Sequence, residues 1–222
     1  MPLNLAIDGP VGAGKSSVAD AVAKRLNILH LDTGAMYRAV GLAAIRQGID
    51  PRDEAGVCTV CDHISVDVRY GQEGQHTLLN GEDVTGLIRT EEVSMAASTV
   101  ARYAHVRQSM VKLQQTLASR QDMLLDGRDI GTRVLPNATV KIYLTASPEE
   151  RARRRFLELE SKGSSDTYEQ VLEDLKKRDQ QDMNRAVDPL RPAEDAVVLD
   201  TTAMDFAAVV DAITALAEAK RV

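Results

Sequence analysis

Eight residues near the start of the chain have the types and spacing of a phosphate-binding loop. They read Gly9-Pro10-Val11-Gly12-Ala13-Gly14-Lys15-Ser16 and fit the pattern Gly-x-x-x-x-Gly-Lys-[Ser/Thr] directly after an apolar segment. The glycines let backbone N–H groups turn inward around an anion, and the helix that follows adds its partial positive charge. We therefore expect residues 9–17 to bind a nucleoside triphosphate, with the Lys15 ammonium at its β- and γ-phosphates.

A magnesium ion has two predicted ligands in the sequence. In loops of this type the hydroxyl after the lysine ligates Mg²⁺, and Ser16 holds that position. Asp126 ends an apolar segment, where such sites carry an acidic residue that holds the metal directly or through water. Two alternatives stay open: Ser17 supplies the hydroxyl instead, or Asp126 only caps the turn that follows its strand.

Arginines form the second group of candidate residues. Phosphoryl transfer between two anions needs neutralisation of charge and exclusion of water, which arginines on mobile elements can supply. The candidates are Arg38, Arg128 and a run in which Arg151, Arg154 and Arg155 share one helix face. The alternative for this run is a solvated helix face. We predict catalytic roles for Lys15, Arg128, Arg151 and Arg154.

The segments around these residues alternate between strands and helices. Apolar runs predict buried strands at residues 3–7, 28–31, 123–126, 140–144 and 196–199. Apolar residues at helical spacing predict helices at residues 15–26, 36–45, 90–101, 105–119, 167–184 and 206–219, with another helix beginning near Pro148. This alternation predicts an α/β fold with a central parallel sheet flanked by helices.

A stretch at about residues 64–84 has a different pattern. Apolar and polar residues alternate over 64–70, residues 71–74 interrupt the alternation, and Asn80-Gly81 is a strong signal for a two-residue hairpin. The stretch predicts a small antiparallel insert of three short strands.

Composition and charge exclude several classes of protein. The chain has 222 residues, 44% of them hydrophobic and 27% charged, and no stretch nears the roughly 20 consecutive apolar residues of a membrane span. Its net charge of −6 argues against nonspecific binding of nucleic acid. Cys58 and Cys61 lack a second pair of metal ligands and are interpreted as small buried hydrophobes. The first residues lack a signal-peptide pattern, so we expect a cytoplasmic protein.

Six blocks of the sequence, in order, resemble the bacterial-type cytidylate kinases. After the phosphate-binding loop they are Leu-Asp-Thr-Gly-Ala-Met-Tyr-Arg at 31–38, Gly-Glu-Asp-Val-Thr at 81–85, Ile-Arg-Thr-Glu-Glu-Val at 88–93, Asp-Gly-Arg-Asp-Ile-Gly-Thr at 126–132 and Arg-Asp-Gln-Gln-Asp-Met-Asn-Arg at 178–185. The resemblance implies transfer of the γ-phosphoryl group of ATP to CMP or dCMP with Mg²⁺. It also implies a P-loop core at 1–35 and 121–222, a short helical lid at about 148–165, and a nucleoside monophosphate-binding domain at 36–120 that contains the insert.

The same resemblance implies roles for the acceptor-binding residues. Thr33, Ser98, Arg107 and Asp129 would surround the cytosine, Asp182 with Arg178 and Arg185 would meet the pentose, and Arg38 and Arg128 would hold the acceptor phosphate. A carboxylate that accepts from the exocyclic amine of cytosine and an arginine that donates to N3 or O2 make a selective pair. Asp129 and Arg107 suit these two tasks.

Alternatives to these roles remain open at the level of sequence. Thr33, where the family often has Ser, and Ser98 can be helix caps, and Asp182 can pair with Arg178 or Arg185 along a helix surface. A kinase for AMP, UMP or a shikimate-like acceptor would not explain the insert. A regulatory GTPase would need an Asn/Thr-Lys-x-Asp motif, which the sequence lacks. We expect a monomer that binds ATP and CMP or dCMP, and neither nucleic acid nor membrane; the preference between CMP and dCMP stays open.

Overall fold

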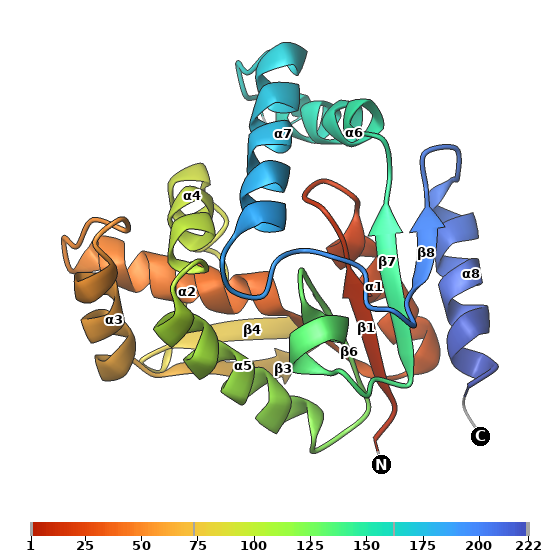
Figure 1. The fold of residues 1–222 in the computed structure, drawn as a ribbon, viewed down its shortest axis with the longest axis horizontal. Coiled ribbons are helices and arrows are strands. Elements are labelled where there is room, and N and C mark those ends of the chain that lie inside the picture. The colour runs from red at the N-terminus through yellow and green to blue at the C-terminus, as the bar shows by residue number, and fades with distance from the viewer. Residues whose placement is uncertain (1, 73, 162, 221–222) are drawn as a thin grey trace. The chain divides into compact units, whose positions relative to one another are not determined.

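The chain forms two compact units (Figure 1). A computed structural model describes residues 2–72, 74–161 and 163–220; residues 1, 73, 162, 221 and 222, which fall within the predicted core, insert and lid, lie outside this description. The chain up to Leu29 and from Gln121 onward forms one unit, here called the core unit, and His30–Arg120 forms the other, here called the inserted unit.

The core unit is built on a parallel sheet, which confirms the predicted fold class. The strand order is β2 (Leu29–Asp32), β6 (Met123–Gly127), β1 (Asn4–Asp8), β7 (Val140–Thr145) and β8 (Val197–Asp200). The edge strand β2 begins at Leu29 of the core unit and continues into the inserted unit. The pairs β1–β6, β1–β7 and β7–β8 are parallel, and Asp8 lies opposite Gly127 in register. Because β1 and β6 are buried almost throughout, they are continuous apolar runs in the sequence.

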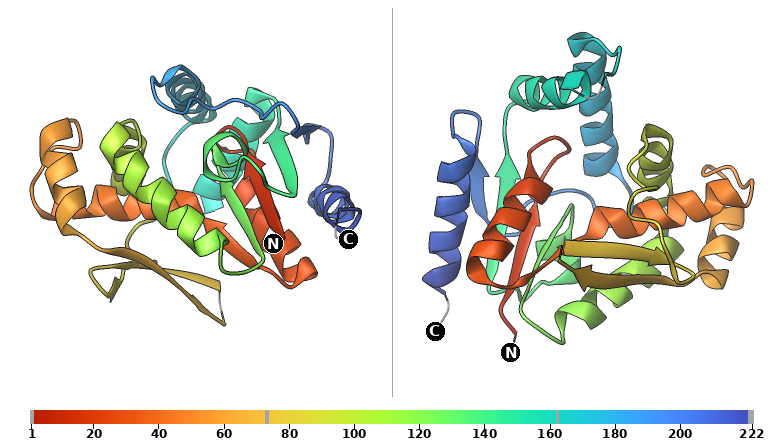
Figure 2. Two further views of the ribbon diagram at one scale, coloured as in Figure 1. Left: turned by 60° about the horizontal axis from the view of Figure 1, so that its bottom comes forward. Right: turned by 180° about the vertical axis from the view of Figure 1, so that it is seen from behind.

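Two helices cover one face of this sheet. α1 (Lys15–Leu26) and α8 (Phe206–Glu218) pack against each other and against the strands, as Figure 2 shows from behind. In α1, Val18, Val22 and Leu26 recur at helical spacing and join one apolar cluster with Leu5 and Ile7 of β1. The apolar pattern of the sequence therefore predicted α1 with its observed bounds.

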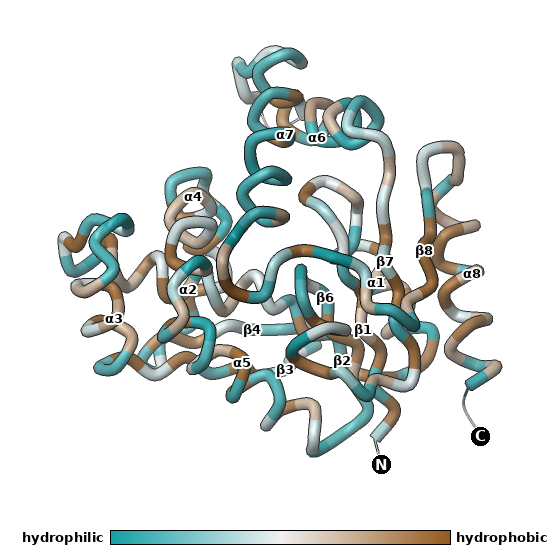
Figure 3. Tube along the Cα trace, viewed as in Figure 1, coloured by the Kyte–Doolittle hydropathy of each residue, from teal (hydrophilic) through white to brown (hydrophobic). Residues whose placement is uncertain are grey.

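A second pair of helices in the core unit is much more polar. α6 (Pro148–Ser161) packs on α7 (Tyr168–Asn184), and both are mostly hydrophilic along their length (Figure 3). Their buried apolar cluster consists of Ala152, Val171 and Leu175, with partly buried side chains around it. A capping box between Thr167 and Gln170 begins α7.

One element of the core unit had no counterpart in the sequence prediction. Residues Ile130–Val134 form a single π-helical turn, η1, after β6. A π turn repeats over about five residues and is too short to leave an apolar period, so the sequence pattern did not reveal it.

The inserted unit contains helices and the predicted antiparallel insert. Its elements are α2 (Thr33–Arg46), α3 (Glu54–His63), β3 (Val66–Gly71), β4 (Gly74–Leu79), β5 (Glu82–Asp83), α4 (Glu91–Val100) and α5 (Ala104–Ala118). The three strands pair in antiparallel order β3-β4-β5. α2 and α4 pack closely because Gly41 has no side chain: a Cβ there would lie 3.0 Å from the Ala97 nitrogen. Within the described ranges, no helix is both long and apolar enough to cross a membrane.

The conformation of the turn between β4 and β5 can be tested by substitution. Asn80 and Gly81 have φ values of 51° and 84°, as a two-residue type I′ turn requires. A Cβ on Gly81 would meet no atom within 4 Å, so Gly81→Ala would act only through backbone strain. We expect Gly81→Ala to lower the free energy of unfolding by about 1–2 kcal/mol. Urea unfolding measures this.

The matched control is Gly86→Ala. An added Cβ at Gly86 also meets nothing within 4 Å, and its φ lies outside the positive region, so we expect almost no change in stability. Equal losses of unfolding free energy in the two variants would contradict a requirement for positive φ at Gly81.

Candidate active site

The loop after β1 has the conformation of an anion site. Gly12 and Gly14 have φ values of 75° and 81°, and a Cβ on Gly9 would lie 2.0 Å from the carbonyl oxygen of Leu144, so only glycine fits there. Gly14 caps α1 without a side-chain hydrogen bond, and the first turn of α1 holds no acidic residue. The N–H groups at this helix end are therefore available to an anion.

Lys15 lies buried beside this loop, with 6% of the residue exposed. Its Nζ donates to the Pro10 carbonyl oxygen at 2.7 Å. Burial, reinforced by the charge of Arg128, lowers the pKa of Lys15 to about 7, although Asp126, Asp182 and Asp8 act in the opposite direction. The Lys15 amine therefore loses its proton more readily than an exposed lysine does.

The two predicted metal ligands lie together. Ser16 Oγ donates to Asp126 Oδ2 at 2.8 Å, and both Ser16 and Ser17 are exposed. A hydroxyl and a carboxylate are oxygen ligands of the kind that Mg²⁺ takes, and neighbouring oxygens on an octahedral Mg²⁺ lie about 3 Å apart. The residues present therefore fit the ion.

Two ion pairs join the segment after β6 to the end of α7, and each segment supplies one arginine and one aspartate. Arg128 Nε contacts Asp182 Oδ2 at 2.7 Å, and Arg185 Nη2 contacts Asp129 Oδ1 at 3.0 Å. The carboxylate of Asp182 thus has a partner outside α7, in the segment after β6. Arg178 is half-buried on the same helix. The structure brings four of the predicted acceptor-binding residues together within the core unit.

Arg151 connects four parts of the core unit. Its guanidinium donates to the carbonyl oxygens of Val11 at 2.8 Å and Ala146 at 2.9 Å, and it contacts Asp179 Oδ2 at 2.7 Å. The phosphate-binding loop, the end of β7 and α7 are thereby tied to α6. Asp179 was not among the predicted site residues, although it lies inside the block at 178–185.

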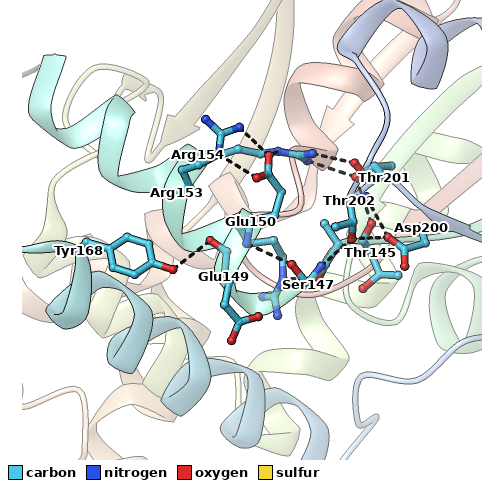
Figure 4. A network of polar contacts seen from close by, with 12 residues as sticks. Thr145, Ser147, Glu149, Glu150, Arg153, Arg154, Tyr168, Asp200, Thr201 and Thr202 are labelled. Atoms are coloured by element: carbon cyan, nitrogen blue, oxygen red, sulfur yellow. Dashed lines mark hydrogen bonds and ion pairs between the residues drawn. The ribbon is translucent and has the colours of Figure 1, made fainter.

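Arg154 belongs to a second network, drawn in Figure 4. Its guanidinium donates to Glu150 Oε1 at 2.8 Å and to the Thr201 carbonyl oxygen at 2.8 Å. Arg153 also binds Glu150, and hydrogen bonding from Arg153 lowers the pKa of Glu150 to about 2. Arg155 pairs with Glu158 on its own helix. The three arginines predicted to share a face thus have different partners.

A cavity of about 240 Å³ lies beside the phosphate-binding loop. Its wall combines aliphatic side chains with guanidinium groups from α6 and residues that follow β8: Ala13, Val18, Glu150, Arg153, Arg154, Thr201, Met204, Phe206 and Val209. Arginine planes and aliphatic walls suit a flat aromatic ring. Thr201, Met204 and Phe206 were not among the predicted site residues; their one signal in the sequence is that they follow a strand end, where ligands of parallel sheets bind.

The inserted unit holds the remaining predicted residues. Arg107 of α5 is 2% exposed, and its guanidinium lies 5.7 Å from the centre of the Tyr37 ring. Arg38 Nη2 contacts Asp32 Oδ2 at 2.6 Å. Its Nη1 lies so close to Gly34 that an added Cβ there would approach it to 3.1 Å. A buried arginine on an aromatic face and a second arginine at the start of α2 give this unit cationic groups suited to an anionic aromatic ligand.

The helix-cap alternatives for two predicted residues are wrong. Asp32 caps α2 by accepting from the Ala35 N–H, and Thr33 is the buried first residue of that helix. Ser98 lies inside α4, which Thr90 caps. Neither hydroxyl is therefore accounted for by capping.

Comparison with known proteins identifies the family. The family model "Cytidylate kinase" matches residues 5–219. The cytidylate kinase of Caldicellulosiruptor bescii is 49% identical over 96% of this chain and 95% of its own, and that of Bacillus subtilis is 45% identical over 98% and 97%. A gluconokinase structure from Sinorhizobium meliloti matches 98% of this chain and 93% of its own with a TM-score of 0.50 at 15% identity, a likeness of fold alone. The chain belongs to the cytidylate kinase family.

Proposed function

We propose that this protein transfers the γ-phosphoryl group of ATP to CMP or dCMP, giving ADP and CDP or dCDP. The observation that carries the proposal is the phosphate-binding loop in a chain of this family, with buried Lys15 and the Ser16–Asp126 pair at the start of α1. We further propose that the protein acts in the cytoplasm as a monomer.

On the donor side, we assign the phosphates of ATP to residues 9–17 and its base to the neighbouring cavity. The cavity of about 240 Å³ is below the range of about 300–1,000 Å³ of sites for larger ligands, which fits one base better than a whole nucleotide. Ser16 and Asp126 would hold Mg²⁺, which when bound neutralises charge on the phosphate oxygens.

On the acceptor side, Arg38 and Arg128 would hold the phosphate, and Arg107 and Asp129 would read the cytosine. Thr33 and Ser98 would add hydroxyls near the base, and Asp182, Arg178 and Arg185 would meet the pentose. Uracil reverses the donor pattern of cytosine, and a buried group left without its partner costs about 1–3 kcal/mol. This set of residues therefore favours CMP over UMP.

The proposed transfer needs no protein nucleophile and no general base. The acceptor phosphate oxygen is already anionic and attacks in line, so the protein has to position two anions and neutralise their charge. Arg151 and Arg154 on α6 are our candidates, beside Lys15 and Arg128, for this neutralisation. In the ligand-free structure their guanidinium groups are bound to carboxylates and carbonyl groups, which phosphate oxygens would replace.

The choice of acceptor is tested by steady-state formation of ADP from ATP and Mg²⁺ with CMP, dCMP, UMP, AMP or shikimate. We expect CMP or dCMP to give the highest kcat/KM, because cytosine offers its exocyclic amine to a carboxylate and both N3 and O2 to an arginine. Uracil reverses the donor pattern at positions 3 and 4, and adenine has no counterpart of O2. Equal or faster turnover with AMP, UMP or shikimate would contradict the proposal.

The hydroxyl on the metal side is tested by Ser16→Ala with Ser17→Ala as its matched control. Ser16 is the serine that bonds to Asp126, so we expect only Ser16→Ala to raise the Mg²⁺ concentration for half-maximal turnover, by about tenfold. Kinetic titration with Mg²⁺ measures this. The reverse result would assign the ligand to Ser17.

The protonation of Lys15 is tested by calorimetry of ATP binding. The free amine has a pKa of about 7, and the charge of bound phosphates raises it, so at pH 8 binding should take up close to one proton. Titrations in buffers of different ionisation enthalpy measure this uptake. Lys15→Arg, which stays charged, should take up none, and equal uptake by both proteins would contradict the assignment.

A further inference from the structure

A buried carboxylate at the end of β1 has no role in the proposed reaction. Asp8 directly precedes Gly9 and is 3% exposed. Its Oδ1 accepts from the Ile130 N–H and its Oδ2 from the Gly131 N–H, both at 2.7 Å. These are the first two N–H groups of η1, and the preceding residue, Asp129, makes no side-chain cap hydrogen bond. Asp8 therefore caps η1 from a strand far away in the sequence.

Asp8 attaches the segment after β6 at two points. Its backbone lies opposite Gly127 in the β1–β6 register, and its carboxylate binds Ile130 and Gly131. Arg128 and Asp129 thus form the tip of a short loop whose two ends are both held by Asp8. The contact is tight, because a Cβ on Gly131 would lie 3.3 Å from Asp8 Oδ2.

An ionised carboxylate is energetically unfavourable beside a site that binds anions, unless the positions of its two oxygens are needed. The site must collect anions, and Asp8 adds a negative charge directly beside the phosphate-binding loop. Burial raises the pKa of Asp8 to about 6, which reflects the cost of keeping the group ionised. Only a carboxylate, however, offers acceptor oxygens to two neighbouring N–H groups, because asparagine would direct its NH₂ group at one of them.

We propose that Asp8 is a positioning residue for the acceptor: by holding both ends of the 127–131 segment, it orients Arg128 and Asp129 toward CMP. This inference rests on the proposed function. Asp8 acts through these two residues and does not itself touch the substrate.

The test is Asp8→Asn with Asp122→Asn as its matched control. Asp122 Oδ1 accepts from the Leu3 N–H at 2.7 Å, which is the same kind of bond at the opposite end of the same two strands. We expect Asp8→Asn to raise the KM for CMP about tenfold, since one buried N–H loses its acceptor on the CMP side. The lost charge also acts on Lys15 in the phosphate-binding loop, so the KM for ATP should change as well, but by a smaller factor. Asp122→Asn should leave both KM values within about twofold of wild type. Urea unfolding of both variants measures the accompanying loss of stability.

Three results would overturn the inference: an unchanged KM for CMP in Asp8→Asn, an equal rise of both KM values, or the same CMP-specific rise in Asp122→Asn. A wild-type protein that binds CMP without phosphorylating it would contradict the proposed function instead. In that case calorimetric affinities for CMP, with the same tenfold expectation, still decide the role of Asp8. Absence of CMP binding by the wild type would overturn both.

Discussion

The carboxyl edge of the core sheet depends on buried arginine and aspartate side chains that neutralise each other in pairs. Arg151 and Arg185 are almost fully buried and each faces a carboxylate, Asp179 or Asp129. A buried ion left unpaired costs several kcal/mol, so these pairs hold the ligand-free site together. Lys15 differs from these arginines, because its ammonium group donates to a carbonyl oxygen and not to a carboxylate. Its pKa is accordingly lowered, to about 7.

Ligand binding in such a site is an exchange of partners. The carboxylates of Asp182 and Asp179 occupy guanidinium groups that the proposed function assigns to phosphates. Both carboxylates lie on α7, so anions that displace them would alter how α7 is held to the loops around it. Arg151 lies in the predicted lid at about 148–165, so recognition of substrate and movement of the lid would share this guanidinium group.

Sequence patterns predicted the helices and strands far better than the contacts between distant side chains. The apolar spacing of Val18, Val22 and Leu26 predicted α1, and Asn80-Gly81 predicted the β4–β5 turn, because both signals are local. The start of α2 was predicted three residues late, since Asp32 begins it by capping and not through an apolar period. The bonds of Asp8 to η1 connect distant segments, and no local pattern encodes them. Within the site, motifs predicted the phosphate-binding loop and the Ser16–Asp126 pair, whereas no motif predicted the residues after β8 that line the cavity.

The small apolar cluster between α6 and α7 has a thermodynamic consequence. Ala152, Val171 and Leu175 are its buried members, whereas the cluster under α1 and α8 is several times larger. Separation of α6 from α7 would expose little apolar surface and would carry a small change in heat capacity. The enthalpy of that separation would therefore vary little with temperature, unlike the enthalpy of unfolding of the sheet.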